Sequence, residues 1–330
     1  MTPTDRSTGR LAPSPTGELH VGHARTFLAA WLAARGAGGR VIFRIEDLDA
    51  TRARPGMTQA ATDSLRWLGL DWDEGPDVGG PHAPYVQSLR FGLYRSALET
   101  LIRTSAVYPC ICTRADRARI ASAPHAGDDT PIAACPCREG DLRPRRAASE
   151  GIRFAWRFRV SAQAVSWVDD FAGKVSINPA EHGDFIVARC TGDIAYQLAV
   201  VVDDAAMGIT HVVRGDDLIP STPRQILLYE ALGHAVPRFA HLPLVVDASG
   251  QRLAKRDESL KLSTLRGAGV PPARLVAALA RSLGIKANSS HVMPEALVGS
   301  FDLASVPKAP WVLDLRAGAD AREWKEAVDS

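Results

Sequence analysis

The chain has 330 residues, enough for a full catalytic domain and one smaller unit. Apolar residues make up 46% and charged residues 23%, an ordinary globular balance, and the net charge of +2 gives no strongly basic signature for nucleic-acid binding. No apolar run is long enough to cross a bilayer and the polar start is unlike a signal peptide, so we expect a cytoplasmic protein with reduced cysteines.

Short apolar runs and helical patterns alternate over the first part of the chain. We expect strands at 10–13 and 41–45 and helices at 20–35 and 58–68. A β-α-β-α opening of this kind predicts an α/β fold with a Rossmann-type parallel sheet, whose ligand lies at the carboxyl ends of the strands. We assign 1–104 to the first half of a nucleotide-binding catalytic domain.

The composition changes over 105–190. This part holds a cluster of four cysteines, a loop rich in small and polar residues, and β-rich pieces at 151–160 and 166–177. It interrupts the nucleotide-binding pattern, so we expect an inserted subdomain.

The nucleotide-binding pattern resumes at 191–262, which we expect to complete the catalytic domain. A helix is expected over 223–232, with Thr222 as its N-cap and Gln225 completing a capping box. The last part, 263–330, is expected to be mainly helical.

Two segments far apart in the sequence carry groups suited to a phosphate-handling site. His20 and His23 flank Gly22 where a strand turns into a helix, and a helix start offers N–H groups and a positive dipole end to a triphosphate. Imidazole donors there can stabilise charge on a phosphate, and glycine leaves room for a nucleotide. Lys255 and Arg256 would supply a mobile cationic lid. Either segment alone is more simply a surface histidine pair or a solvated basic turn, but together they predict one site.

The cysteines form two C-x-C pairs separated by a loop: Cys110, Cys112, Cys135 and Cys137. Four thiolates suit one structural zinc ion in tetrahedral coordination, with no position left open for water. The alternative is four reduced thiols without a metal. Cys190 stands alone and is expected to be buried. The remaining histidines, His241 among them, are expected to pack or hydrogen-bond locally.

Four ordered blocks closely resemble class I aminoacyl-tRNA synthetases of the glutamyl branch. Residues 10–26 resemble that branch's extended HIGH motif, 44–49 its acidic motif at a strand end, 202–217 a third block, and 252–256 the KMSKS loop. The family's loop usually has a serine where this chain has Ala254, which removes one hydroxyl donor but keeps the lysine.

The resemblance implies ATP-dependent activation of L-glutamate to glutamyl-adenylate, with Mg²⁺ accompanying the ATP, and then transfer of glutamate to RNA. His20, His23 and Lys255 would be the catalytic residues: the histidines stabilise the reacting phosphate and the lysine neutralises the leaving pyrophosphate. The implied ATP contacts are His20, Gly22, His23, Lys255 and Arg256.

The resemblance also implies a glutamate pocket, lined by Arg10, Ser14, Glu46, Tyr196 and Arg214. A guanidinium fork matches a carboxylate, so both arginines suit the acidic substrate, while Glu46 is suited to its ammonium group. The alternatives are an ion pair between Arg214 and Asp216 or Asp217, and a core packing role for Tyr196.

For the metal site, the related enzymes are expected to use a C-x-C pair, a tyrosine and one further cysteine. Ala133 occupies the position of that tyrosine, so Cys135 is expected to replace it, with His125 as an alternative ligand.

Glutamyl-tRNA synthetases carry a long helical anticodon-binding region after the lid loop, whereas this chain ends at Ser330. That difference and the cysteine cluster resemble the shorter relatives that attach glutamate to the queuosine base of tRNA(Asp). An unstacked base in an anticodon loop is accessible to a pocket, so queuosine-bearing tRNA(Asp) is the expected partner of a monomeric enzyme. The alternatives are a truncated glutamyl-tRNA synthetase that charges a terminal adenosine, and a catalytically silent RNA-binding paralogue.

Overall fold

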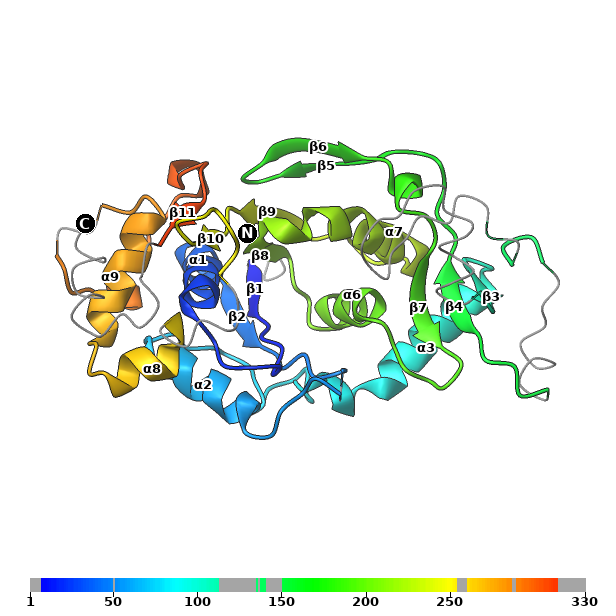
Figure 1. Ribbon diagram of the computed structural model, residues 1–330, viewed down its shortest axis with the longest axis horizontal. Coiled ribbons are helices and arrows are strands. Elements are labelled where there is room, and N and C mark those ends of the chain that lie inside the picture. Colours follow the sequence, from blue (N-terminus) through cyan, green and yellow to red (C-terminus); the bar gives the residue numbers. More distant parts are fainter. Residues whose placement is uncertain are drawn as a thin grey trace.

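The computed structural model describes residues 7–49, 51–112, 135, 137–140, 150–253, 260–286 and 289–313. The molecule is elongated, with the C-terminal helices at one end, the first strands and helices next to them, and an antiparallel sheet at the other end (Figure 1). Within these ranges, no helix has the length and apolar character needed to span a bilayer.

The chain opens as a β-α-β-α unit. Strands β1 (Thr8–Leu11) and β2 (Arg40–Phe43) pair in parallel and are joined by α1 (Val21–Gly36), and α2 (Met57–Trp67) follows. This confirms the expected opening, with element boundaries shifted by one or two residues. Helix α1 buries Leu28, Trp31 and Leu32. Its position follows because packing against the strands and the later helices removes these side chains from water.

The second half of the catalytic sheet lies beside the first. Strands β8 (His211–Gly215) and β9 (Arg238–Leu242) are parallel and are linked by α7 (Thr222–Leu232), with α6 (Tyr196–Ala206) before them. The Thr210 backbone N–H donates to the Thr8 carbonyl at 3.0 Å, which holds β8 beside β1. The carboxyl ends of β1, β2 and β8 therefore meet on one side of the molecule.

A hairpin from the 105–190 segment extends this sheet. Strand β5 (Val165–Asp169) pairs in parallel with β9 and antiparallel with β6 (Gly173–Ile177), giving the order β6-β5-β9-β8. The other strands of this segment, β3 (Val107–Cys110), β4 (Ala155–Phe158) and β7 (Phe185–Arg189), form a separate antiparallel sheet. Helix α3 (Phe91–Arg103) leads into β3 (Figure 1). Part of the segment is thus continuous with the catalytic sheet rather than set apart from it.

The C-terminal part packs on α1. Helices α8 (Leu262–Gly267) and α9 (Pro272–Ser282) are followed by short 3-10 turns, and β10 (Val245–Val246) pairs with β11 (Trp311–Val312). The expectation of a mainly helical tail is therefore wrong for 289–313. Short turns replace a helix there because prolines at 294, 307 and 310 break the helical pattern.

Candidate active site

The two histidines of the first motif sit at the start of α1 and cap it. His20 is the N-cap residue: its Nδ1 accepts from the Gly22 N–H at 3.1 Å, and the His23 Nδ1 accepts from the His20 N–H at 3.3 Å. The ring centroids are 3.8 Å apart. A ring nitrogen that accepts carries no proton, so each neutral ring carries its proton on Nε2. Each ring therefore carries an Nε2–H group, the kind of donor that can bind a phosphate oxygen.

Gly22 allows this arrangement. A Cβ atom at this position would lie 3.0 Å from the His20 Cε1 and 3.1 Å from its Nδ1. Any larger residue would thus push the ring away from the N–H that it caps. The glycine serves the histidine in addition to the expected role of leaving room for a nucleotide.

The flanks of the second motif attach beside the same helix start. On one side, the Leu253 N–H donates to the Val245 carbonyl at 3.4 Å, and the Val245 Cβ is 3.7 Å from a Cβ built on Gly22. On the other side, the Leu262 N–H donates to the Leu19 carbonyl at 2.9 Å. Lys255 and Arg256 fall outside the described residues, so their contacts with ATP stay a prediction.

Two ion pairs strengthen these attachments. The Lys261 Nζ lies 3.3 Å from the Glu18 Oε2, two residues before His20. Arg252 pairs with Asp217, which follows β8. The segment that carries the lid motif thus begins and ends next to the paired histidines.

The residues of the expected glutamate pocket come together at the carboxyl ends of the strands: Arg10 in β1, Ser14 and Glu46 in the following loops, Arg214 in β8, and Tyr196 at the start of α6. The Glu46 N–H donates to the Pro13 carbonyl at 3.0 Å, which places Glu46 beside Ser14. Tyr196 is 39% exposed, so the alternative of a core aromatic is wrong. Desolvation of its hydroxyl and the nearby Glu46 charge raise the pKa of Tyr196 to about 12.

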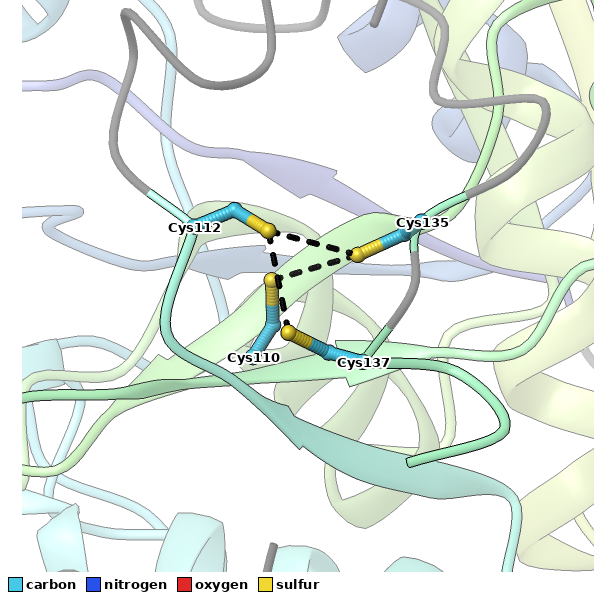
Figure 2. A group of neighbouring side chains, drawn as sticks. All are labelled: Cys110, Cys112, Cys135 and Cys137. Carbon is cyan, nitrogen blue, oxygen red and sulfur yellow. Dashed lines mark hydrogen bonds between the residues drawn. The ribbon is translucent and has the colours of Figure 1, made fainter. Parts of the chain in front are cut away.

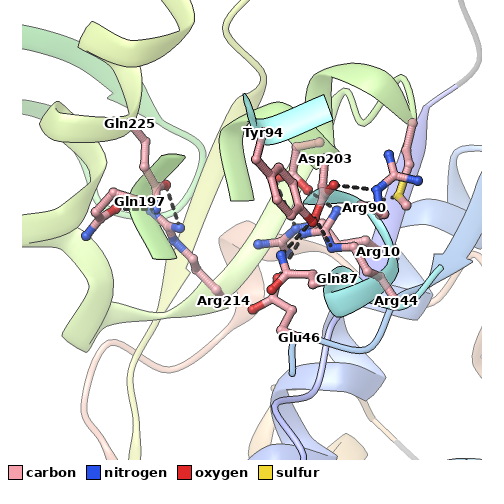
Figure 3. Close-up of polar contacts among 12 residues, drawn as sticks. Arg10, Arg44, Glu46, Gln87, Arg90, Tyr94, Gln197, Asp203, Arg214 and Gln225 are labelled. Atoms are coloured by element: carbon pink, nitrogen blue, oxygen red, sulfur yellow. Dashed lines mark hydrogen bonds and ion pairs between the residues drawn. The ribbon is translucent and has the colours of Figure 1, made fainter. Parts of the chain in front are cut away.

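A fully buried arginine organises the Glu46 side of this pocket. Arg44 contacts the Glu46 Oε1 through Nη2 at 2.9 Å and the Asp204 Oδ1 through Nη1 at 2.7 Å. The other Asp204 oxygen lies 3.5 Å from the Arg10 Nε. Burial raises the pKa of Glu46, although the charges of Arg44 and Arg10 oppose this rise. Arg44 and Asp204 therefore fix the positions of Glu46 and Arg10, and Figure 3 shows Arg10, Arg44 and Glu46 close together.

Asp203 belongs to the same network, because it lies 3.8 Å from the Arg44 Nε. Its carboxylate accepts from the Gln87 Nε2 at 2.8 Å, the Arg90 Nε at 2.6 Å and the Tyr94 hydroxyl at 2.9 Å. Arg44, Asp203 and Asp204 were not expected as site residues. The sequence signals were their places in the blocks 44–49 and 202–217 that resemble the synthetase family, and an acidic pair inside the otherwise apolar stretch 198–207.

Arg214 has a different environment. Its three nitrogens donate to neutral acceptors: Nε to the His241 Nε2 at 3.0 Å, Nη1 to the Gln225 Oε1 at 2.8 Å, and Nη2 to the Thr222 hydroxyl at 2.9 Å. No carboxylate of the described residues forms an ion pair with it, so the expected alternative of a pair with Asp216 or Asp217 is wrong. The side chain is nearly buried, and desolvation lowers the pKa of Arg214.

The expected capping box of α7 is wrong, because its side chains have other partners. Thr222 lies inside the helix, Ser221 is the N-cap residue, and no side chain caps the helix start. The preceding 3-10 helix, Asp216–Ser221, supplies the Ile219 carbonyl to the Thr222 N–H, which removes the need for a side-chain cap. The Thr222 and Gln225 side chains instead bind Arg214.

The four clustered cysteines converge as expected (Figure 2). The Cys135 Sγ lies 3.6 Å from both the Cys110 and Cys112 Sγ atoms, the Cys112 and Cys137 Sγ atoms are also 3.6 Å apart, and all four lie within 4.8 Å of one another. Tetrahedral zinc with Zn–S bonds of about 2.3 Å requires sulfurs about 3.8 Å apart. The donor set and its spacing fit a structural zinc ion.

Cys110 and Cys190 have different environments, since the first is buried and the second is exposed. Burial raises the pKa of Cys110 to about 11, so this thiol is protonated at neutral pH unless a metal displaces the proton. Cys190 is exposed, and its sulfur accepts from the Phe154 N–H at 3.4 Å, so the expectation that it is buried is wrong. His125 and Ala133 lie outside the described residues.

Comparisons with known proteins agree with this geometry. Residues 7–317 match the family described as "tRNA synthetases class I (E and Q), catalytic domain". A glutamyl-Q tRNA(Asp) synthetase of Symbiobacterium thermophilum is 51% identical over 304 residues, covering 92% of this chain and 94% of that protein. A glutamate–tRNA ligase of the same organism is 40% identical, covering 92% of this chain and 64% of that protein.

Solved structures show the same fold. A glutamate tRNA ligase from Elizabethkingia meningosepticum, in complex with its amino acid, has a TM-score of 0.84 at 30% identity and covers 97% of this chain and 68% of that one. The Rossmann-type catalytic fold is thereby confirmed. The chain belongs to the class I tRNA synthetases of the E and Q type, in the group of glutamyl-Q tRNA(Asp) synthetases, and is a ligase of the aminoacyl-tRNA synthetase class.

Proposed function

We propose that this enzyme activates L-glutamate with ATP and transfers it to the queuosine base in the anticodon of tRNA(Asp). One observation carries the choice of acceptor. Within Symbiobacterium thermophilum, the chain is 51% identical to a glutamyl-Q tRNA(Asp) synthetase and 40% identical to a glutamate–tRNA ligase. The comparison within one organism supports queuosine over a terminal adenosine.

The activation step needs positioning and positive charge. A glutamate α-carboxylate oxygen attacks the α-phosphorus of ATP, the new P–O bond forms, and the bond to the pyrophosphate oxygen breaks without a proton transfer. The Nε2–H donors of His20 and His23 are suited to the charge that develops on the phosphate. Lys255 and Arg256 would neutralise the pyrophosphate, and Mg²⁺ would accompany the ATP.

The charge of Arg214 supports its proposed role in recognising glutamate. Three of its five N–H groups are used by the three neutral acceptors, and each terminal nitrogen carries a second N–H. These donors suit the side-chain carboxylate of the substrate, with Arg10 contributing a second positive charge. Glu46 would hold the ammonium group, and Ser14 and Tyr196 would line the pocket.

The remaining assignments follow from the thiol cluster and the tRNA partner. We propose that Cys110, Cys112, Cys135 and Cys137 hold one structural zinc ion, and that the surrounding 105–190 segment binds the acceptor. A tRNA substrate places the enzyme in the cytoplasm, where we expect it to act as a monomer.

The acceptor assay tests this proposal. The enzyme is incubated with ATP and radiolabelled L-glutamate, together with tRNA(Asp) with queuosine, tRNA(Asp) without queuosine, or tRNA(Glu). Label is expected only on queuosine-bearing tRNA(Asp). Label on tRNA(Glu) with none on queuosine-bearing tRNA(Asp) would instead identify an enzyme that charges the terminal adenosine.

A further inference from the structure

One partner of Arg214 has no part in the function proposed above. His241 in β9 is 1% exposed, and its Nε2 accepts from the Arg214 Nε at 3.0 Å. Its Nδ1 lies 2.5 Å from the Oδ2 of Asp169, which ends β5 and is also 1% exposed. Three buried residues from three neighbouring strands therefore form a line, Asp169–His241–Arg214, that ends at the substrate pocket.

The backbone fixes the orientation of Asp169. Its Oδ1 accepts from the backbone N–H groups of Phe171 at 3.1 Å, Ala172 at 2.9 Å and His241 at 3.1 Å. Its Oδ2 therefore faces the imidazole. Burial opposes ionisation of this carboxyl, but the hydrogen bonds from the His241 ring and from the backbone of Ala172 lower the pKa of Asp169 to about 2.

An ionised Asp169 determines the tautomer of His241. The carboxylate can only accept, so the Nδ1 of the ring must carry the proton, and Nε2 then holds the lone pair that accepts from Arg214. The Thr222 hydroxyl lies 3.1 Å from the same Nε2 and accepts from the Arg214 Nη2 at 2.9 Å. The ring thus contacts the Arg214 guanidinium and one of its other two acceptors, the Thr222 hydroxyl.

We infer that Asp169 and His241 are positioning residues that hold Arg214 toward the glutamate side chain without neutralising its charge. This inference rests on the proposed function. A carboxylate in direct contact with Arg214 would compete with the substrate for the same cation. A neutral imidazole can orient the Arg214 guanidinium group equally well. The anion that orients the imidazole, Asp169, contacts the opposite nitrogen of the ring and not Arg214 itself.

The arrangement favours glutamate over glutamine. A glutamate side chain supplies a carboxylate in direct contact with Arg214, which the described residues do not, since Asp204 and Asp169 act on Arg214 only from a distance. Glutamine would leave a nearly buried cation without an anion in direct contact, which is costly in a low-dielectric site. Loss of the correct fork orientation is therefore expected to weaken glutamate binding more than glutamine binding.

The inference also predicts a pH dependence. The charged groups that act on His241 are Asp169, Arg214, Arg10 and Asp216. Burial and the charge of Arg214 outweigh the attraction of Asp169 and lower the pKa of His241, so the ring is neutral at pH 7. Protonation would place an N–H on Nε2 against the Arg214 Nε–H. Glutamate affinity is expected to fall as the pH drops through this lowered pKa.

Asp169→Asn tests the inference at almost constant volume. The three backbone N–H groups should keep the amide oxygen at the Oδ1 position, so the amide NH₂ would face His241 and force the proton onto Nε2. We expect the Kd for L-glutamate, measured by calorimetry, to rise about 10- to 100-fold, because a hydrogen bond to a charged group is replaced by two opposed donors. The ratio of the L-glutamine Kd to the L-glutamate Kd should fall.

Asp170→Asn is the matched control. The neighbouring Asp170 pairs with the His211 Nε2 at 3.0 Å and the Arg238 Nη2 at 2.8 Å, away from Arg214, so its L-glutamate Kd should stay within about twofold of wild type. An Asp169→Asn protein with unchanged Kd and unchanged glutamate preference would overturn the inference and leave the proposed function intact. A wild-type protein that binds no L-glutamate would overturn the proposed function itself.

A measurement on the wild-type protein keeps the inference testable if Asp169→Asn does not fold. Nitrogen-15 NMR of the His241 ring at pH 7 distinguishes the tautomers. We expect a protonated Nδ1 and an unprotonated Nε2. A proton on Nε2 would contradict the inference that His241 accepts from Arg214 and positions it.

Discussion

Two buried arginines of this pocket differ in what surrounds them. Arg44 contacts the carboxylates of Glu46, Asp203 and Asp204 at 2.9, 3.8 and 2.7 Å, and these charges raise its pKa against the cost of burial. Arg214 contacts an imidazole, an amide and a hydroxyl, and burial lowers its pKa. Arg44 is neutralised by carboxylates of the protein, whereas Arg214 forms no ion pair with a carboxylate of the described residues.

The difference extends to the network around each arginine. On the Arg44 side, the three arginines Arg10, Arg44 and Arg90 are matched by Glu46, Asp203 and Asp204, so the charges balance. On the Arg214 side, one positive charge has no such match among the described residues. A balanced buried network stabilises the fold, whereas an unbalanced one selects a charged ligand. The comparison therefore separates a network whose charges are paired within the protein from an arginine that forms no ion pair with a described carboxylate, as the proposed recognition of glutamate requires.

Arg44→Met should produce the largest effect, and on stability. Removing the cation leaves three carboxylates without their shared partner, a change that typically costs about 3–5 kcal/mol in the free energy of unfolding. Urea denaturation measures this loss. The control is Arg52→Met, whose partner Asp49 lies in an exposed pair and whose loss should cost less than about 1 kcal/mol. Equal losses in the two variants would mean that the buried network does not stabilise the fold.

Arg214→Met should have the opposite pattern. The L-glutamate Kd is expected to rise about 30- to 1000-fold, because a buried charged partner of the substrate is removed. Its loss of unfolding free energy should be smaller than that of Arg44→Met, since no protein carboxylate is left unpaired. Arg238→Met, an exposed arginine in the next strand, is the control for the loss of one positive charge. Unchanged glutamate affinity in Arg214→Met would contradict the proposed difference between Arg214 as a substrate-binding residue and Arg44 as a structural one.

The four clustered thiols are a second site that we expect to bind a charged ligand, and the pH dependence of zinc binding should test this. Burial raises the pKa of Cys110 to about 11, so the metal-free thiol is protonated at pH 7 and zinc binding must release its proton. Zinc affinity should rise about tenfold per pH unit for each proton released. Competition with a chelator at pH 6, 7 and 8 measures this slope, and an affinity independent of pH would exclude thiolate ligation.

Cys112→Ser should lower the zinc content below one ion per chain and destabilise the sheet that carries the cluster. Metal analysis after gel filtration, with Cys190→Ser as the control, checks this prediction. Equal zinc content in both variants would remove the zinc assignment.

Gly22→Ala should have the smallest effect, about 3- to 30-fold on the rate of adenylate formation, with little change in glutamate binding. The added Cβ would meet the His20 ring at 3.0 Å and displace its Nε2–H by a few tenths of an ångström. Gly17→Ala is the control, because nothing lies within 4 Å of a Cβ at that position. Equal rates in the two variants would show that the His20 position does not limit the reaction.

The sequence predicts the parts of this molecule whose signals are local. The β-α-β-α opening, the histidine pair and the two C-x-C pairs each lie within a short stretch, and the structure bears out the elements and the clustering of the thiols. The capping box at Thr222 fails, because whether a threonine caps a helix or binds a guanidinium depends on what packs beside it.

Longer-range partners are outside such reasoning. His241 is 27 residues from Arg214 and 72 from Asp169, and only the pairing of β5, β8 and β9 brings the three together. A histidine in an apolar strand gives no sign of this role. The hairpin that supplies Asp169 also lies in the segment expected to be a separate insertion, which hides its connection with the catalytic sheet.

Amino-acid-dependent exchange of pyrophosphate into ATP, in the presence of queuosine-bearing tRNA(Asp), tests the central claim most directly. The proposed role of Arg214, which forms no ion pair with a described carboxylate, predicts strong exchange with L-glutamate and at least about 100-fold less with L-glutamine. Equal exchange with both amino acids, or none with glutamate, would contradict the account.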